Sequence, residues 1–423
     1  MKFMVGTSAL ALVASAVFGG AAQATDQELV IFNWLGGSER EMIVKLEEGF
    51  EAKYPEIDVK DINPAAGGDD ARGGIRTALL AGEKFDILIN TWPSLEKEMV
   101  DNGLLQPLDG AWEQYGWSSA LSDSWRNLSN HDGKTYGAYF IAGNRSGLWH
   151  RTDTLKGAGI ESVPTEWDGF LASFGSLSES GKLPVFIGAR SWAQTEWFEN
   201  ALLKTAGTDF AGKLARHEAK WTDEPVKATF RNMRDMLQAN CCADAETMLS
   251  THWTDAADAV LKDGKAGYML IGTWVNSRAS NEYALTPGDD YDFVQFPTID
   301  PAHADAMSVD GKNLVVMENA ANPEAAEKFI DYVLSPEGSA IIAQYGQATP
   351  SAHSDLSGYD PVVAKYAALL QSSDVFFVLD DLLPAELSGE FRVSLQKFLK
   401  DPSDANIDAI TQAIEAKANE VYR

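Results

Sequence analysis

Tryptophan is the residue type whose placement in this chain most clearly suggests a chemistry. The chain has 423 residues and 12 tryptophans, four of which fall at the ends of expected strands or in the turns after them. Open α/β sheets present ligand sites at such positions, and a flat indole can stack on the apolar C–H face of a pyranose ring. The sequence therefore predicts a ligand-stacking surface made by Trp34, Trp92, Trp192 and Trp274, with packing in the hydrophobic core as the alternative role of each ring.

A sugar also needs polar groups for its rim of hydroxyls, which both donate and accept hydrogen bonds. A buried hydroxyl left without a partner costs about 1 to 3 kcal/mol, so these groups would decide which sugar binds. Glu39 lies in the first turn of an expected helix, and Asp310 precedes Gly311 at the start of an expected strand. For Glu39 the alternative role is that of an exposed acid which only complements the helix dipole.

Patterns typical of catalysis or cofactor binding do not occur in the chain. It has no G-x-x-x-x-G-K-[ST], G-x-G-x-x-G, G-x-S-x-G or H-E-x-x-H pattern. The six histidines lack the paired spacing of a zinc site. We therefore expect no catalytic residue, no metal site and no cofactor. A secreted glycoside-processing enzyme is the competing hypothesis, because two of the 62 acids could meet across a cleft, but the sequence selects no pair.

The two cysteines are adjacent, at Cys241 and Cys242. In an oxidising compartment they can pair only with each other, or they can stay reduced. The pattern favours two thiols at the end of a helix, and the vicinal disulfide remains the alternative.

The first residues and the overall charge indicate where the protein works. Residues 1–24 combine Lys2, an apolar run from Val5 to about Gly20 and a small-x-small site ending at Ala24, which is typical of a cleavable signal peptide. No cysteine near the cut could carry a lipid, so we expect a soluble periplasmic protein. The formal net charge of -28 argues against nucleic acid and anionic membrane surfaces as partners.

The elements that would position these side chains follow from hydrophobic periodicity and turn residues. The first part of the chain alternates strands and helices, which predicts a parallel, doubly wound sheet. Ser38 and Glu41 form a capping-box pattern at the start of the first helix. The expected strands cover 29–34, 57–59 and 85–89, and the expected helices run from 38 to about 54 and from 75 to 80.

The later part of the chain repeats this alternation, which predicts a second α/β lobe. Proline follows a capping residue at Asn322-Pro323 and at Ser335-Pro336, so a helix is expected to begin at each. Strands are expected at 183–187, 266–271 and 313–316, and helices at 196–205 and, with a break at Asp401-Pro402, over 384–422.

The chain resembles the extracellular solute-binding proteins of carbohydrate importers, the family that includes maltose- and glucose-binding proteins. Seven short stretches, taken in order and spacing, carry the resemblance, which spans essentially the whole chain after residue 24. They are Phe32-Asn33-Trp34 with Glu39; Phe50 to Pro55; Leu80 to Asp86; Lys134 to Gly137; Leu148 to Arg151; Gly264 to Met269 before Trp274; and Asn322 to Ala326 through Ser335 to Gly338.

The resemblance implies a two-lobed α/β periplasmic-binding-protein fold, with crossings between the lobes near 139–145, 296–301 and 346 and a ligand cleft between them. On that basis the N-terminal lobe takes residues 25–139 and 298–345, and the C-terminal lobe takes 140–297 and 346–423. The family often has Tyr-Asn where this chain has His150-Arg151, and a proline where it has Ala138. These two departures weaken the transfer of any particular sugar from the family.

The resemblance further implies that the protein binds a mono- or short oligosaccharide and delivers it, as a monomer, to the permease of an ABC importer. Arg145, beside the first crossing, becomes a candidate for clamping a hydroxyl pair or for an ion pair between lobes, and Asp380 joins the candidate site. A cationic amine such as a polyamine or betaine is the alternative ligand, because indoles with carboxylates also bind cations.

Overall fold

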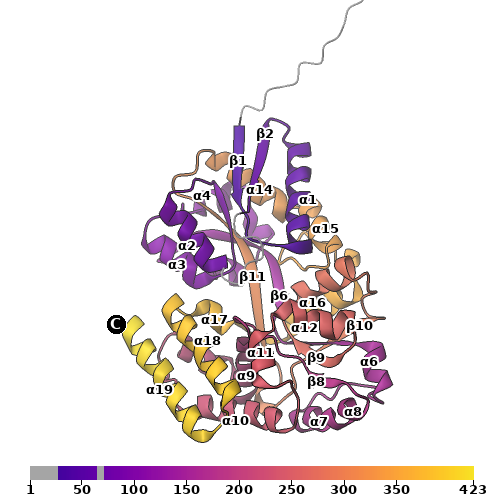
Figure 1. The fold of residues 1–423 in the computed structure, drawn as a ribbon. Helices are drawn as coiled ribbons and strands as arrows, with labels where there is room; N and C mark the ends of the chain where they lie inside the picture. Colours follow the sequence, from indigo (N-terminus) through magenta and orange to yellow (C-terminus); the bar gives the residue numbers. More distant parts are fainter. Residues whose placement is uncertain (1–26, 64–70) are drawn as a thin grey trace, which may run out of the picture.

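The structure is a computed structural model that describes residues 27–63 and 71–423. The predicted signal peptide lies outside these residues. Two sheets with helices packed against them form two lobes, one above the other in Figure 1, and the long strands β6 and β11 run between them.

The first three strands and two helices of the N-terminal lobe confirm the predicted β-α-β-α-β order. The parallel strands are β1 (Gln27–Phe32), β2 (Ile57–Ile62) and β3 (Ile87–Asn90), and β1 lies between the other two. Helices α1 (Gly37–Lys53) and α2 (Ala71–Ala81) connect them. The buried apolar residues of α1 follow a helical period, with Met42, Ile43, Leu46 and Phe50 in the core.

The predicted parallel character holds for these three strands but not for the whole sheet, which is mixed. Strand β11 (Ala306–Val316) pairs antiparallel with β3 and with β6 (Gly137–Asn144), and parallel with β12 (Asp374–Phe377). The sequence predicted only residues 313–316 of β11. Its earlier part contains Asp310, Gly311 and Lys312, residues that are poor strand formers yet are held in the sheet by pairing with β6.

A second sheet organises the C-terminal lobe, in the order β10-β7-β9-β8. Its strands are β7 (Gly147–Arg151), β8 (Leu183–Val185), β9 (Ala266–Leu270) and β10 (Tyr291–Gln295). The predicted strands at 183–187 and 266–271 are thus confirmed, whereas β7 and β10 were not predicted. A two-stranded ribbon, β4 (Asn130–His131) with β5 (Lys134–Thr135), lies outside both sheets.

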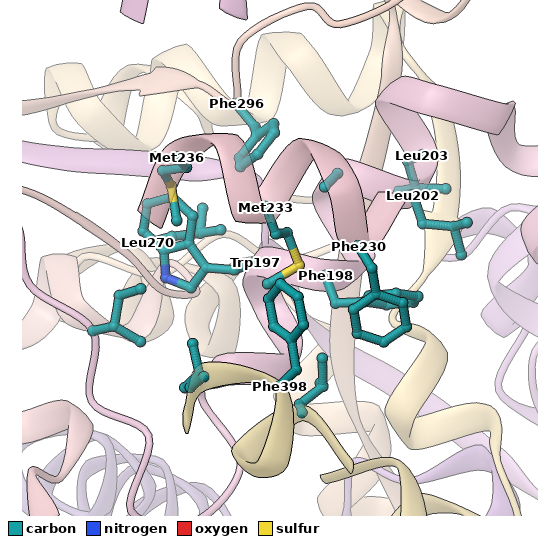
Figure 2. Packing of buried hydrophobic residues seen from close by; sticks show 14 of the residues in the cluster. Trp197, Phe198, Leu202, Leu203, Phe230, Met233, Met236, Leu270, Phe296 and Phe398 are labelled. Carbon is teal, nitrogen blue, oxygen red and sulfur yellow. The ribbon is translucent and has the colours of Figure 1, made fainter. Parts of the chain in front are cut away.

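The C-terminal lobe has an extended core in which the last helices pack on the long helix α9 (Gln194–Ala215). Figure 2 shows Trp197 and Phe198 of α9 close to Phe230 and Met233 of α10 (Glu224–Gln238) and to Phe398 of α18 (Ala385–Lys400). Fully burying one such side chain stabilises the fold by about 1.5 to 3 kcal/mol. Helix α18 and the final helix α19 (Asp404–Val421) confirm the predicted break at Asp401-Pro402.

The remaining helices are short and mostly connect or cover the sheets. The helices that begin at Pro323 and Pro336 confirm the two predicted proline starts. The α-helices not yet given are α3 (Pro93–Asp101), α4 (Asp109–Gln114), α5 (Asp123–Asn127), α6 (Thr152–Gly157), α7 (Trp167–Ala172), α8 (Phe174–Glu179), α11 (Ala245–Ser250), α12 (Trp253–Ala257), α13 (Trp274–Ser277), α14 (Pro323–Leu334), α15 (Pro336–Gln344), α16 (Pro361–Ser372) and α17 (Leu379–Leu382).

Two local predictions were wrong. Helix α1 begins at Gly37, with Gly36 as its cap, so Ser38 does not form the predicted capping box; its hydroxyl accepts a hydrogen bond from Ser277 of the other lobe instead. Cys241 and Cys242 are joined by a disulfide rather than left as thiols. Cys241 is fully buried in the core of the C-terminal lobe, so the bonded pair is part of the packing there.

Over the part of the chain that the structure describes, no helix is both long and apolar enough to cross a bilayer. The same residues include no group of histidine, cysteine or carboxylate side chains suited to holding a metal ion.

Candidate ligand-binding site

A cavity of about 450 Å³ lies between the two lobes. The eight residues predicted from the sequence all line it, although they come from seven separate stretches of the chain. They are Trp34, Glu39, Trp92, Arg145, Trp192, Trp274, Asp310 and Asp380.

Two indoles form the wall of the cavity on the side of the N-terminal lobe. Trp34 follows β1 and Trp92 follows β3, so the parallel pairing of these strands brings the two turns together. Their ring centroids are 4.9 Å apart. The indole nitrogen of Trp34 donates to the carbonyl of Ile89 (2.8 Å), and the side-chain oxygen of Asn90 accepts from the Trp92 amide (3.2 Å). The Trp34 ring is therefore held by its own hydrogen bond, and the turn that carries Trp92 is held by a hydrogen bond of its backbone amide.

The C-terminal lobe contributes three further indoles. The ring centroids of Trp192 and Trp274 are 5.9 Å apart, and Trp253 meets Trp274 edge-on at 6.1 Å. Gly272 lies against the Trp274 ring so closely that a Cβ at position 272 would overlap it. Trp253 was not among the predicted residues, because it opens helix α12 rather than following a strand.

Arg145 is the centre of an ion cluster at the crossing between β6 and β7. Its guanidinium donates to Glu196 of α9 (Nε to Oε1, 2.6 Å) and to Asp310 of β11 (3.2 Å). The same guanidinium lies 4.7 Å from the ring centroid of Trp274 and 5.4 Å from that of Trp192. Arg145 thus joins a carboxylate from each lobe and also supports the indoles of the C-terminal lobe.

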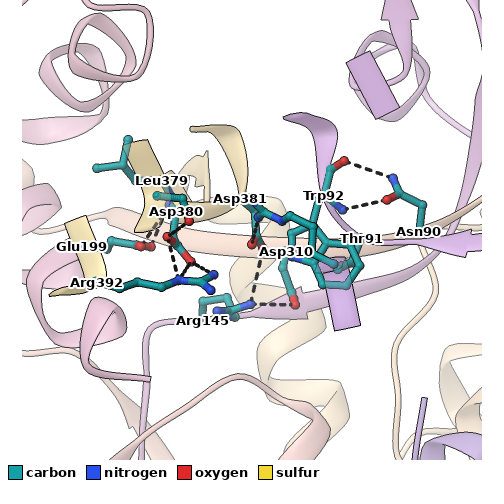
Figure 3. A network of polar contacts seen from close by, with 12 residues as sticks. Asn90, Thr91, Trp92, Arg145, Glu199, Asp310, Leu379, Asp380, Asp381 and Arg392 are labelled. Carbon is teal, nitrogen blue, oxygen red and sulfur yellow. Dashed lines mark hydrogen bonds and ion pairs between the residues drawn. The ribbon is translucent and has the colours of Figure 1, made fainter. Parts of the chain in front are cut away.

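A second set of ion pairs surrounds the short helix α17, as Figure 3 shows. Arg392 of α18 forms a bidentate pair with Asp380, which also accepts from the Ser388 hydroxyl (2.7 Å). Glu199 of α9 accepts the backbone amides of Leu379 and Asp380 (3.2 and 3.1 Å). The Asp380 carboxylate therefore helps to fix α17 on the C-terminal lobe as well as lining the cavity.

Asp381, the next residue, connects this helix with the N-terminal lobe. Its carboxylate lies 3.3 Å from the guanidinium of Arg72 in α2, and 3.9 Å from that of Arg145. The Arg72 guanidinium also lies over the Trp92 ring, 5.4 Å from its centroid. Sequence reasoning missed both residues. Their proximity depends on how the lobes meet, and no local pattern records it.

Burial and crowding of acids shift the pKa values of this cluster. Burial raises the pKa of Glu196 to about 7 against the opposing effect of Arg145, and burial likewise raises that of Asp381 to about 6. Burial and the neighbouring Glu196 raise the pKa of Glu199 well above its ordinary value. For Asp380 burial acts upward, but the guanidinium groups of Arg392 and Arg72 and the Ser388 hydroxyl together outweigh it and lower the pKa.

Glu39 lies in the first turn of α1 and pairs with Lys312 of β11 (2.9 Å), both from the N-terminal lobe. The Lys312 ammonium also lies 5.9 Å from the ring centroid of Trp274, across the cavity. Glu39 is therefore engaged in an ion pair and does more than complement the helix dipole.

The start of α1 touches the other lobe at the edge of the cavity. The Ser277 hydroxyl donates to that of Ser38 (2.9 Å), and the Ser38 amide donates to Glu282 (3.4 Å). Gly37 has a left-handed backbone (φ +55°), and a Cβ there would lie only 2.7 Å from the Glu282 carboxylate. Glycine at this position thus permits the close approach of the two lobes.

The arrangement suits the binding of a polyol. Indole surfaces from both lobes face one cavity, and side chains that donate or accept hydrogen bonds lie between them. The lining residues outside the predicted set are Gly36, Gly37, Ser38, Arg40, Ala71, Arg72, Thr91, His252, Trp253, Thr254, Arg278, Glu282, Lys312, Asp381 and Arg392.

Comparisons with known proteins agree with this description. A sequence model of the family described as bacterial extracellular solute-binding protein matches residues 36–340. The chain is 26% identical over 391 residues to an ABC transporter extracellular-binding protein of Pyrococcus horikoshii. The aligned residues cover 88% of this chain and 84% of that one. It is 25% identical over 354 residues to the alpha-glucosides-binding periplasmic protein AglE of Rhizobium meliloti, over 78% of this chain and 76% of that one.

Solved structures share the fold across nearly the whole chain. The bacterial solute receptor AcbH, described as having an exclusive preference for β-D-galactopyranose, superposes with a TM-score of 0.84 at 20% identity, covering 94% of this chain and 100% of that one. A chitin oligosaccharide binding protein superposes with a TM-score of 0.82 at 17% identity, covering 93% and 98%. The predicted two-lobed α/β fold is thus confirmed.

Proposed function

Because this chain belongs to the family of bacterial extracellular solute-binding proteins, we propose that it captures a sugar between its two lobes and hands it to the permease of an ABC importer. The observation that carries the proposal is the cavity between the lobes, which tryptophans from both lobes and several ionic side chains line. The similarity to AglE, an alpha-glucosides-binding protein, supports a carbohydrate ligand.

The finer features predicted from the sequence belong to the same proposal. The protein acts as a monomer in the periplasm after removal of residues 1–24, and it catalyses no reaction. Its N-terminal lobe comprises residues 25–139 and 298–345, and its C-terminal lobe comprises 140–297 and 346–423. The eight predicted residues contact the ligand or hold those that do.

Ligand binding favours a closed arrangement of the lobes, because only that arrangement lets both indole groups touch one molecule. Contacts such as those of Ser38 with Ser277 and Glu282 then belong to the closed form. The surface created by closure is what a permease can distinguish from the ligand-free protein.

A thermal-shift panel tests the proposal with neutral mono- and disaccharides, polyamines and betaines. A ligand at 100 times its Kd adds about 2.7 kcal/mol to the free energy of unfolding, so a true ligand raises the melting temperature clearly. Stabilisation by at least one sugar, with a smaller radius of gyration in solution scattering, supports sugar capture. Stabilisation by amines alone refutes the sugar proposal and favours the amine alternative.

A further inference from the structure

We infer that the ligand of this cavity is an uncharged glycoside of two rings, with one ring against Trp34 and Trp92 and the other against the indoles of the opposite lobe. The inference rests on the proposed function and specifies its ligand class. It has two independent grounds: how the indoles are distributed, and how the charges around the cavity are paired.

The indoles form two separate groups rather than one. Trp34 and Trp92 belong to turns of the N-terminal lobe and contact each other. Trp192, Trp253 and Trp274 belong to the C-terminal lobe and contact one another through Trp274. Each group offers an apolar surface of the kind that takes one pyranose. Two groups facing one cavity therefore suit a ligand with two ring faces to cover.

The size of the cavity agrees with two rings. Its volume of about 450 Å³ falls in the range of roughly 300 to 1,000 Å³ that holds drug-sized ligands. A disaccharide has about 23 non-hydrogen atoms and suits such a volume, whereas a hexose has about 12 and leaves part of the cavity to water. The fold itself does not fix this choice, because the structurally similar AcbH is described with a single galactopyranose.

The charges that line the cavity are already matched within the protein. All six lysine and arginine side chains of the lining form ion pairs, and so do its five carboxylates. The pairs are Arg40 with Asp61, Arg72 with Asp381, Arg145 with Glu196 and Asp310, Arg278 with Asp258 and Glu282, Lys312 with Glu39, and Arg392 with Asp380.

Several of these pairs are deeply buried, which is why they discriminate against charged ligands. The side chains of Lys312, Arg145 and Asp310 are 5%, 7% and 5% exposed. A ligand carboxylate or ammonium would have to displace a partner from such a pair or enter the cavity without compensation, and both are unfavourable. A neutral hydroxyl instead accepts or donates alongside an intact pair.

Isothermal titration calorimetry of the wild-type chain tests ring number and charge together. The panel holds α- and β-linked neutral disaccharides of glucose and galactose, the two monosaccharides, cellobiouronic acid and the chitosan disaccharide. We expect one neutral disaccharide to bind at least about a hundredfold more tightly than its monosaccharides and than either charged disaccharide. A monosaccharide or a charged disaccharide within tenfold of the best ligand overturns the inference but leaves sugar capture intact. Absence of binding by every sugar overturns both.

Two tryptophan variants test whether the rings occupy separate surfaces. Trp34→Ala and Trp192→Ala remove one indole from each group, and Trp125→Phe, outside the cavity lining, serves as the matched control. We expect both alanine variants to weaken disaccharide binding by about tenfold or more, and only one of them to weaken the residual binding of a monosaccharide. Equal loss of monosaccharide binding in both variants shows one ring held between the two lobes and overturns the inference. Circular dichroism checks that each variant is folded.

A gain of binding gives the sharpest test of the charge argument. Glu39→Gln leaves the Lys312 ammonium without its carboxylate while keeping the side-chain volume. We expect this variant to bind cellobiouronic acid at least about tenfold more tightly than the wild-type chain does, and to bind the chitosan disaccharide no better. Unchanged or weaker binding of the acid by the variant contradicts charge matching as the reason for selectivity.

Discussion

Two groups of residues around the cavity are held in place in different ways. The indole wall of the N-terminal lobe, Trp34 with Trp92, is positioned by turns of a single sheet and by hydrogen bonds to neighbouring residues. The ion cluster around Arg145 joins carboxylates from α9, β11 and α17, which lie far apart in the sequence. The wall is a property of one lobe, whereas the cluster exists only where the two lobes meet.

On the proposed function, this difference separates two contributions to ligand binding. A wall fixed by its own sheet keeps its shape when the lobes move apart, so it can receive the ligand first. A cluster that includes the contact between Arg72 and Asp381 changes when the lobes separate. The ion cluster therefore links the cavity to the relative position of the lobes, and the indole wall does not.

Removing the centre of the ion cluster should have the largest effect. Arg145→Met leaves Glu196 and Asp310 buried without their cation, which should lower the free energy of unfolding by about 3 to 5 kcal/mol and abolish measurable ligand binding. Urea denaturation and calorimetry measure the two effects. Arg40→Met is the matched control, because Arg40 also lines the cavity but is 39% exposed and should change stability by under about 1 kcal/mol. Similar results for both variants would show that the buried ion cluster contributes no more than an exposed ion pair.

Disturbing the indole wall should affect binding more than stability. The Asn90 side chain accepts from the Trp92 amide and donates to Asn313 (3.0 Å). Asn90→Ala should move Trp92 and weaken binding about tenfold, at a cost to folding of about 1 to 3 kcal/mol. Fluorescence titration and urea denaturation measure this, and Asn102→Ala, at the exposed end of α3, is the control. Unchanged affinity in Asn90→Ala would show that the wall does not depend on this hydrogen bond.

The ion cluster should also respond to pH in a way that the wall cannot. Burial raises the pKa of Glu196 to about 7. Between the ordinary pKa of a glutamate and about pH 7, the folded protein therefore holds a proton that the unfolded chain has released. The resulting stability is fully present below that ordinary pKa and is lost as the pH rises through about 7. Asp381, with a pKa of about 6, and Glu47, with a pKa of about 8, act in the same direction. His150, whose pKa burial lowers to about 4, acts in the opposite direction.

Comparison with Glu196→Gln measures the contribution of Glu196 together with its effect on the pKa of the neighbouring Glu199. Between pH 8 and pH 5 the wild-type chain should gain about 2 to 3 kcal/mol more in free energy of unfolding than the variant does. Urea denaturation at several pH values measures the difference. Parallel pH profiles for the two proteins would mean that Glu196 stays ionised in the folded state.

The smallest effect is expected from the disulfide, which belongs to neither group. Cys241 and Cys242 are absent from the cavity lining, and a cross-link between adjacent residues removes little conformational entropy from the unfolded chain. The double substitution of both cysteines by alanine should leave the Kd of the ligand unchanged within about twofold and lower stability by about 1 kcal/mol. A large change in affinity would show that the segment containing the two cysteines influences the cavity.

The sequence predicted the indole wall better than the ion cluster for a physical reason. Trp34 and Trp92 follow strands that hydrophobic periodicity identifies, and parallel pairing brings the ends of such strands together. Arg145, Asp310 and Asp380 were predicted as individual candidates, but their partners Glu196, Asp381 and Arg392 were not. Ion pairs between residues that distant leave no periodic pattern in a single sequence.

The same limit applies to the fold. The helices that begin at Pro323 and Pro336 were predicted because proline and a capping residue mark their starts locally. Strand β11 was predicted only in its apolar end. The part from Asp310 to Lys312 is extended because β6 pairs with it, although its own residues do not favour a strand. That part also carries two of the side chains that line the cavity.

The contact between Gly272 and the ring of Trp274 has an evolutionary consequence. Any other residue at position 272 must shift the indole, because its Cβ would occupy the space of the ring. One codon change outside the cavity lining would therefore move an indole that lines the cavity. Receptors of this kind can therefore acquire a new ligand specificity through a single substitution at this position.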